Sequence, residues 1–187
     1  MINFDMTNEE YHAHKDVLSA SGTKTIAFDD LATFKYAERK ESAAFDVGTA
    51  THTLVLQPDL SDTIWMGAAD RRGLAWKKTK LEAEEAGALL LTEGDYLLAH
   101  DMAEAVRANK AAAELLSGDL VCEASVFAKH EHTGIDIRCR PDGWRRDIGA
   151  LIDLKTTITS DPAGFGKQVS NFGYHVQDQH YRMCMEA

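Results

Sequence analysis

The sequence predicts an α/β (α+β) fold, with a mixed central sheet flanked by helices and an N-terminal part that is mainly helical. Two patterns predict this class. Helical signals with identifiable caps fill residues 7–116, and the apolar pattern then changes to a period of two over residues 121–156, before a last helical segment. The chain has 187 residues, 44% of them hydrophobic and 27% charged, which suits one globular domain.

Cap residues mark the first three predicted helices. Thr7 is followed three residues later by a glutamate, which is the pattern of a capping box, so a helical turn is predicted to start there. A short helix is predicted to begin at Ser19, and another, capped by Asp29 or Asp30, to run toward Arg39. We expect these segments to serve packing and assign no chemistry to them.

A longer helix is predicted over residues 46–57, with Asp46 as its cap and Pro58 just past its end. His52 lies in the middle of its buried-type face. Such a histidine is more often a hydrogen-bonded core residue, and the alternative is a metal ligand or a group that orients a metal-bound water. At helical spacing this face contains Phe45, Gly48, Thr49, His52, Val55 and Leu56.

The next part of the chain alternates short strands with helices. We predict a strand over residues 63–66, a helix from about residue 76 to residue 86, and a short apolar strand or linker over residues 88–91. A long amphipathic helix is predicted over residues 92–116. Its expected core stripe consists of Leu97, Leu98, Met102, Ala105 and Val106.

Basic side chains gather around Trp76. The net charge of −10 alone argues against a nucleic-acid partner, but the distribution of charge matters more than the sum. The common interpretation of a charged helix is a solvated face. The alternative is a segment that follows phosphates, with Trp76 available for stacking on a base. The cations of this segment are Arg71, Arg72, Lys77, Lys78 and Lys80.

Three strands are predicted in the second half of the chain, over residues 121–129, 135–140 and 150–156. The first carries Glu123 on the face opposite its small apolar residues. A hairpin turn at residues 130–134 contains two histidines, which we expect water to surround, because loop tips are exposed.

The clearest chemistry lies between Arg138 and Lys155. Asp142 occupies a Pro-Asp-Gly turn after the second strand, and Asp153 and Lys155 are predicted to share one face of the third. Two carboxylates beside an ammonium provide a hard-cation site with a water-handling group next to it. For the Asp-x-Lys triplet alone, a solvated ion pair is the more common explanation.

The last segment, residues 174–187, is predicted to be a helix on which Gln177 and Tyr181 share a face. The sequence contains neither a signal-peptide pattern nor an apolar run of membrane-spanning length, so we expect a cytoplasmic protein without a membrane partner. Three cysteines form no paired framework and are expected to be small buried residues: Cys122, Cys139 and Cys184.

Four motifs together resemble the PD-(D/E)XK nuclease superfamily and, within it, the RecE-type exonucleases of prophages (exodeoxyribonuclease VIII, nuclease domain). Each motif is weak alone, but their order and predicted element types make the likeness specific. The resemblance covers nearly the whole chain and implies a restriction-endonuclease-like core, as a single nuclease domain over residues 1–187. The motifs are Gly48-Thr-Ala-Thr-His52, Arg140-Pro-Asp142, Asp153-Leu-Lys155-Thr-Thr and Gln177-x-x-x-Tyr181.

The resemblance implies a Mg²⁺ site, at which Mn²⁺ can substitute. Asp142, Asp153 and His52 would hold the ion, together with the backbone carbonyl of Leu154. Lys155 would position or deprotonate the attacking water and offset charge on the phosphate. This agrees with the needs of phosphodiester hydrolysis, which requires an activated water and neutralised phosphate oxygens.

The resemblance also implies a contribution of Glu123 through a water, and a place for Gln177 and Tyr181 beside the nucleic acid. The implied activity is digestion of one strand of double-stranded DNA from an end, 5′ to 3′, leaving a 3′ single strand for an annealing recombinase. Family members continue beyond the helix of Gln177, so we expect this chain to lack their C-terminal elements. A ring-shaped homo-oligomer is implied if the full family fold is present.

Two other functions stay open at this point. One is a non-catalytic module of the same fold that binds DNA or serves assembly. The other is an endonuclease or a single-strand nuclease of the same superfamily.

Overall fold

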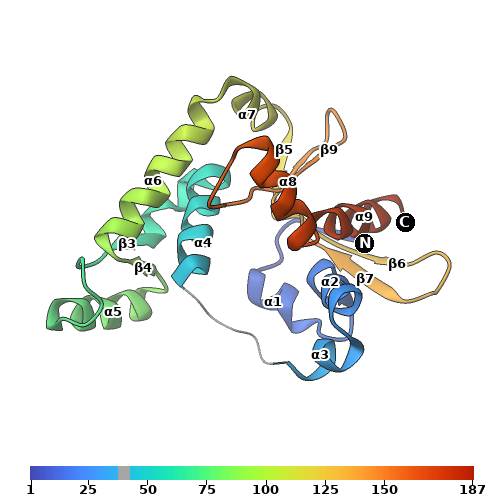
Figure 1. The fold of residues 1–187 in the computed structure, drawn as a ribbon, viewed down its shortest axis with the longest axis horizontal. Coiled ribbons are helices and arrows are strands. Elements are labelled where there is room, and N and C mark those ends of the chain that lie inside the picture. The colour runs from blue at the N-terminus through green and yellow to red at the C-terminus, as the bar shows by residue number, and fades with distance from the viewer. Residues whose placement is uncertain (38–42) are drawn as a thin grey trace.

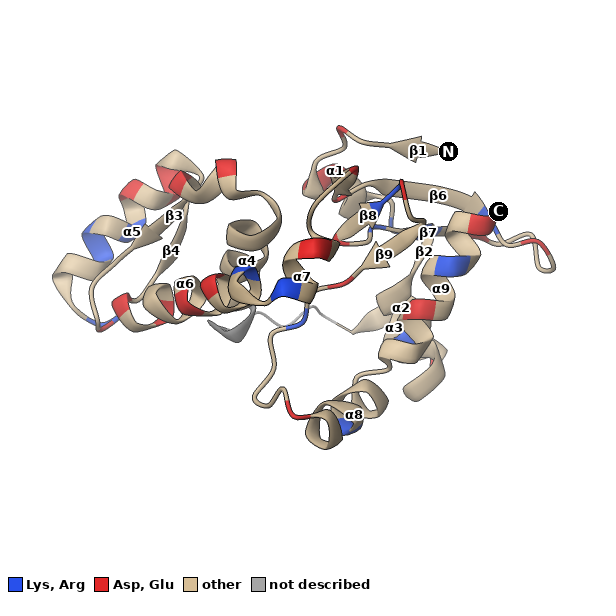
Figure 2. Cartoon of the chain, turned by 90° about the horizontal axis from the view of Figure 1, so that it is seen from above, with Lys and Arg blue, Asp and Glu red and all other residues tan. Residues whose placement is uncertain are grey.

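The computed structural model describes residues 1–37 and 43–187, with side chains from Asp46 onward in the second range. Its elements form two lobes that lie side by side in both views (Figure 1, Figure 2). We call residues 43–115 the helical lobe and the remaining described residues the sheet lobe. The helical lobe contains α4 (Ala43–Leu56), the 3₁₀ helix η1 (Pro58–Thr63), β3 (Ile64–Met66), α5 (Leu74–Ala86), β4 (Leu89–Leu91), α6 (Glu93–Ala108) and α7 (Lys110–Leu115).

The helical lobe is organised by the packing of α4 against α6. Its core includes three fully buried alanines, Ala50, Ala99 and Ala103, whose small side chains allow the helices to approach closely. The predicted strands β3 and β4 are present and pair in parallel. This packing fixes the position of α4, the helix that carries His52.

Three details of the helical lobe differ from the sequence predictions. Helix α4 begins at Ala43, so Asp46 lies in its first turn instead of capping it, and the side chain of Phe45 lies outside the described residues. Leu97 and Leu98 are 52% and 50% exposed, because α6 turns its alanines toward the core instead. The long predicted helix is also interrupted at Asn109, whose side chain caps α7.

The sheet lobe contains two sheets whose strands pair mainly in antiparallel orientation. A mixed four-stranded sheet has the order β1-β6-β7-β2, in which only β2 runs parallel to its neighbour β7. A three-stranded antiparallel sheet has the order β5-β8-β9. The strands are β1 (Ile2–Asn3), β2 (Leu18–Ser19), β5 (Leu120–Cys122), β6 (Ser125–Lys129), β7 (Asp136–Cys139), β8 (Gly143–Arg145) and β9 (Ala150–Ile152).

The three predicted strands correspond to four observed strands in two sheets, and β8 is a further strand in the segment between Gly143 and Gly149 that was predicted to be a turn. The first predicted strand breaks at Glu123, which has a φ of 57°, a left-handed conformation that is uncommon for a residue with a side chain. The chain changes sheets at this break, so β5 and β6 pair with different partners. The third predicted strand ends at Ile152, before Asp153. The hairpin turn between β6 and β7 is confirmed.

Five further helices complete the sheet lobe. Thr7 caps the first with a complete capping box, and Ser19 and Asp30 cap the next two, as predicted. The expected continuation toward Arg39 lies outside the described residues. These helices are α1 (Asn8–Ala13), α2 (Ala20–Phe28), α3 (Leu31–Tyr36), α8 (Pro162–Asn171) and α9 (Tyr174–Glu186).

Helix α9 covers the four-stranded sheet and packs against β6, β7 and α2 (Figure 1). Its contact with the sheet buries Cys184 beside Cys139, Val126 and Ile137. All three cysteines are free, and Cys139 and Cys184 are buried as expected, whereas Cys122 is only half-buried. The predicted class, a mixed sheet with flanking helices, is confirmed. Among the described helices, none is long and apolar enough to cross a membrane.

Candidate active site

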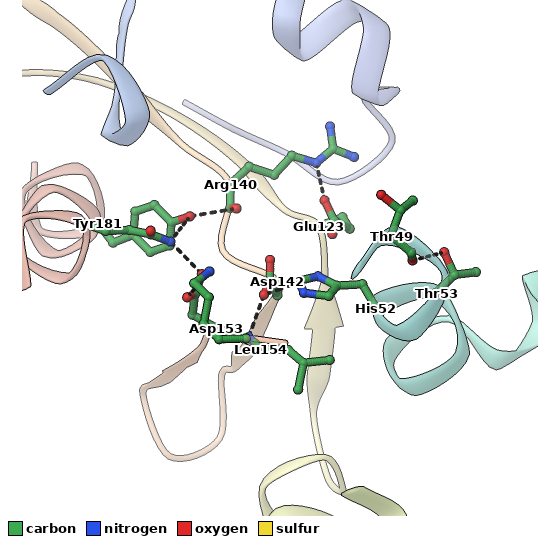
Figure 3. A network of polar contacts seen from close by, with 11 residues as sticks. Thr49, His52, Thr53, Glu123, Arg140, Asp142, Asp153, Leu154 and Tyr181 are labelled. Atoms are coloured by element: carbon green, nitrogen blue, oxygen red, sulfur yellow. Dashed lines mark hydrogen bonds and ion pairs between the residues drawn. The ribbon is translucent and has the colours of Figure 1, made fainter. Parts of the chain in front are cut away.

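The predicted site residues meet where the two lobes join. Asp142 lies in the bend between β7 and β8, and Asp153 and Lys155 follow the end of β9. The antiparallel register pairs Gly143 with Ile152, so the next pair beyond the ladder is Asp142 and Asp153. Both acids thus leave the same end of one hairpin, although the prediction that Asp153 and Lys155 lie within a strand is wrong. Figure 3 shows the two aspartates with His52, which α4 contributes.

Asp142 is the more buried of the two acids, with 14% of its side chain exposed. Its Oδ2 accepts a hydrogen bond of 2.6 Å from the backbone N–H of Leu154 and lies 3.5 Å from Nδ1 of His52. Burial and, to a smaller extent, the nearby carboxylate of Asp153 raise the pKa of Asp142 to about 7, against the opposing effects of Lys155 and the Leu154 N–H. A carboxyl group with this pKa titrates near neutral pH.

Asp153 is held by two donors. Its Oδ2 forms an ion pair with Nζ of Lys155, and its Oδ1 accepts a hydrogen bond of 2.6 Å from Nε2 of Gln177. The same amide nitrogen donates to the hydroxyl of Tyr181 at 3.0 Å, and that hydroxyl donates to the backbone carbonyl of Arg140 at 3.3 Å. The prediction that Gln177 and Tyr181 share a face of the last helix is confirmed, and that face contacts the site.

His52 faces Asp142 from across the junction between the lobes (Figure 3). Burial lowers its pKa, and Lys155 lowers it further, while a hydrogen bond to the Leu154 carbonyl acts in the opposite direction. The lowered pKa favours the neutral imidazole, which is the form able to bind a metal. The same hydrogen bond places the Leu154 carbonyl next to His52, and the role of this carbonyl as a metal ligand stays a prediction.

Glu123 lies beside these residues but is bound to an arginine. Its carboxylate accepts a hydrogen bond of 2.7 Å from Nε of Arg140 (Figure 3). Burial raises the pKa of Glu123, and Arg140 lowers it, while Asp142 adds to the increase. The carboxylate of Glu123 thus projects toward Arg140 from the residue at which the chain changes sheets.

Two cavities open on either side of the Glu123–Arg140 pair, which contributes to the wall of both. The larger, about 560 Å³, reaches His52 and Thr156, and the smaller, about 230 Å³, reaches Lys24. The site can therefore be approached from both sides of this ion pair. Other lining residues of the smaller cavity include Ser19, Ser21, Gln177 and Tyr181.

The basic segment around Trp76 is not part of this site, since α5 lies at the far end of the helical lobe from β8 and β9 (Figure 2). Trp76 is 7% exposed and packs in the lobe, so it is not available for the stacking that the sequence suggested. Arg71 is paired with Asp46 at 3.7 Å and with Asp95 at 3.3 Å. The remaining candidates of this segment are exposed, namely Arg72, Lys77 and Lys78.

Sequence reasoning missed Lys24 and Tyr174. Nζ of Lys24 donates a 3.0 Å hydrogen bond to Oε1 of Gln177. The ring of Tyr174 has two ammonium groups near its centroid, that of Lys155 at 5.4 Å and that of Lys24 at 5.8 Å. The signal was weak, because Lys24 lies in a short helix whose pattern predicts only packing.

The oxygen and nitrogen ligands of this site suit a hard divalent cation, although they are not arranged as a complete metal site. Among the described residues, no group of three or more His, Cys, Asp or Glu side chains is placed to hold a metal ion. Asp153 is instead engaged by Lys155 and Gln177. Asp142, however, is buried next to a second carboxylate with a raised pKa, a repulsion that a divalent cation would relieve. Oxygen ligands of this kind fit Mg²⁺ or Mn²⁺.

A comparison with protein families gives an independent result. A family model described as a PDDEXK-like domain of unknown function (DUF3799) matches residues 23–187. The match includes all residues of the site, from Lys24 on α2 to Tyr181 on α9. No curated protein matches the chain.

Proposed function

The chain belongs to the family of PDDEXK-like domains, and on this premise we propose that it is a divalent-metal-dependent deoxyribonuclease. One observation carries the proposal more than any other. Asp142, Asp153 and His52, which lie far apart in the sequence, meet in one polar cluster with the Lys155 ammonium paired to Asp153. Gathering two carboxylates and a lysine in a partly buried place is costly, and such clusters are typical of active sites.

Each residue of the cluster has a role that its geometry supports. Asp142, Asp153 and the Leu154 carbonyl would hold the cation, with His52 at the edge of the same group. The cation, when bound, supplies an activated water near neutral pH and neutralises charge on the phosphate oxygens. Binding would require Asp153 to share its carboxylate with an ion as well as with Lys155.

Lys155 is the residue best placed to handle water and phosphate. Its ammonium forms an ion pair with Asp153 and lies 5.4 Å from the centroid of the Tyr174 ring, so two contacts fix its position. From there the ammonium can orient the attacking water or stabilise charge that develops on the phosphate, and in its neutral form the amine can accept a proton from that water.

The finer activity follows from the resemblance to RecE-type exonucleases. We propose digestion of double-stranded DNA from its ends in the 5′ to 3′ direction with Mg²⁺, producing 3′ single strands for an annealing recombinase. A homo-oligomeric ring around the duplex belongs to the same proposal.

The decisive test is cleavage of end-labelled linear duplex DNA with and without Mg²⁺. Wild-type protein should release nucleotides only with Mg²⁺, while Asp153→Ala and Lys155→Ala should be inactive. Lys35→Ala, at an exposed position of α3, is a matched control that should remain active. Equal digestion by the Asp153 and Lys155 variants and the wild type would refute the proposal. Circular duplex distinguishes an end-dependent enzyme, which leaves it intact, from an endonuclease.

A second candidate is a DNA-binding module without turnover. It is favoured by the engagement of Asp153 with Lys155 and Gln177, which leaves no preassembled three-ligand group among the described residues. Retained binding of duplex DNA without cleavage in either Mg²⁺ or Mn²⁺ would support this candidate over the nuclease.

A further inference from the structure

A hydrogen-bonded chain connects α2 to the candidate catalytic carboxylate. Nζ of Lys24 donates to Oε1 of Gln177 at 3.0 Å, and Nε2 of Gln177 donates to Oδ1 of Asp153 at 2.6 Å. Gln177 is 7% exposed, so its side-chain amide is enclosed by these partners. The order of donors and acceptors along this chain determines how the amide is oriented.

The hydrogen bonds from Lys24 through Gln177 to Asp153 have one consistent order of donors and acceptors. A lysine ammonium has only donors and an ionised carboxylate only acceptors, so the Gln177 amide satisfies both only with its oxygen toward Lys24 and its nitrogen toward Asp153. Tyr181 agrees with this order, because its hydroxyl donates to the Arg140 carbonyl and accepts from the Gln177 nitrogen. An amide turned by 180° would place its carbonyl oxygen against the Asp153 carboxylate, which is repulsive.

The helix that carries Lys24 is anchored next to the site. The neighbouring residue Thr23 is hydrogen-bonded through Oγ1 to Nδ1 of His180 at 3.0 Å, and the other ring nitrogen of His180 lies 3.0 Å from the carbonyl oxygen of Arg138. Helix α2 is thereby tied to α9 and to β7 next to the site. The half-buried Lys24 side chain thus comes from a docked helix and not from a free loop.

The position of Lys24 is unfavourable for a purely structural lysine. Its ammonium and that of Lys155 lie near the same Tyr174 ring, at 5.8 and 5.4 Å. Burial lowers the pKa of Lys24, and repulsion from Lys155 lowers it further, whereas Asp153 raises it. Two like charges in one partly buried place are retained only when other contacts compensate.

We infer that Lys24 is a positioning residue, which orients the Gln177 amide and through it the Asp153 carboxylate and its partner Lys155. This inference rests on the proposed nuclease function, and it adds a residue outside the four sequence motifs. Groups that orient a ligating carboxylate typically change metal affinity or activity by about 10- to 100-fold.

A double-mutant cycle between positions 24 and 177 tests this inference. The four proteins are wild type, Lys24→Met, Gln177→Leu and the double variant. Mn²⁺ affinity is measured from the electron paramagnetic resonance signal of free Mn²⁺, and kcat is measured on linear duplex with Mg²⁺. Removing a nearby positive charge by itself tightens cation binding, but this contribution occurs in both backgrounds and cancels in the cycle.

We expect Lys24→Met to lower kcat about tenfold when Gln177 is present and to change it less than about twofold when position 177 is leucine. The Mn²⁺ affinities should show a coupling of at least about fivefold between the two positions. Lys24→Arg, which keeps the donors, should restore kcat to within about threefold of wild type. Equal effects of Lys24→Met in both backgrounds would overturn the inference, because Lys24 would then act by charge alone.

Two control variants separate positioning from packing. Thr23→Val removes the adjacent link between α2 and α9 without touching Gln177, and should lower thermal stability while retaining most of kcat. A loss of kcat in Thr23→Val as large as that in Lys24→Met would reduce Lys24 to a structural residue. Lys35→Met controls for the loss of one exposed lysine. A wild-type protein that neither binds Mn²⁺ nor cleaves DNA would remove the proposed function and this inference together.

Discussion

Two charged regions of this protein differ in how they are built. Around α5, the charges are neighbours in the sequence, and Arg72 and Lys78 pair with acids of their own segment, Asp70 at 3.2 Å and Glu82 at 3.8 Å. At the junction of the lobes, the charged side chains come from α2, from the break between β5 and β6 and from the segments after β7 and β9, and α4 and α9 add polar side chains to them. Exposed local pairs contribute little free energy, whereas charges gathered from distant elements into a partly buried place mark a functional site.

This difference teaches that clustering along the sequence is a poor guide to a binding site. The basic segment has the higher local density of cations, but its aromatic residue is buried and its Arg71 is shared between two aspartates. The junction has few cations, and each contacts a residue of the site. The predictions below test this contrast, from the largest expected effect to the smallest.

The largest effect is expected at Lys155. Lys155→Met should lower the rate of DNA cleavage by about 10³-fold, since it removes a group that acts on water or on phosphate charge. Lys77→Met, on α5, should change the rate less than about twofold under conditions where DNA is saturating. The comparison uses initial rates on linear duplex at saturating DNA, and comparable losses in both variants would abolish the distinction between the regions.

The Glu123–Arg140 pair should be the next most sensitive position. Arg140→Met leaves the half-buried carboxylate of Glu123 near Asp142 without its partner, and should destabilise the protein by about 1–3 kcal/mol. The measurement is urea denaturation of the wild type and the variant. The double variant Glu123→Gln/Arg140→Met should recover part of the loss, and a lack of recovery would mean that Arg140 stabilises the fold by other contacts.

Asp142 should lower the stability of the metal-free protein while being required for its activity. Its pKa is raised from 3.8 to about 7 in the folded protein, so the folded state binds this proton more tightly than the unfolded chain does. The resulting stabilisation is complete below about pH 4 and is lost as pH rises through about 7. Metal-free Asp142→Asn should therefore have a Tm several degrees above that of metal-free wild type at pH 8. The corresponding gain in free energy of unfolding is at most about 4 kcal/mol.

The same variant should be inactive and should gain no thermal stability from Mg²⁺. Thermal melts at pH 5 and pH 8, with and without the ion, check both statements. A wild type whose stability relative to Asp142→Asn does not change between these two pH values would contradict the raised pKa.

The smallest effect is expected from the exposed cations near α5. We propose that Arg72, Lys77 and Lys78 contact phosphate, so neutralising all three should weaken DNA affinity and reduce the salt slope by about one for each lost contact. Affinity measured as a function of salt concentration tests this. An unchanged slope would leave these residues as an ordinary solvated face.

Local signals in the sequence were sufficient for much of this protein. Caps at Thr7, Ser19 and Asp30 follow from hydrogen bonds within a few residues, and the helix that carries Gln177 and Tyr181 follows from spacing. The superfamily assignment from four short motifs is confirmed by the family match. The finer RecE-type properties stay predictions.

Only the tertiary structure decided which residues meet. At the break between β5 and β6, Glu123 pairs with Arg140, which is seventeen positions away, and the burial of Trp76 and the exposure of Leu97 depend on how the helical lobe packs. The role of Lys24 depends on Gln177, 153 positions later in the chain. A sequence records periodicity and caps because these arise within a few residues, whereas pairings between distant side chains are selected by the free energy of the whole packed fold.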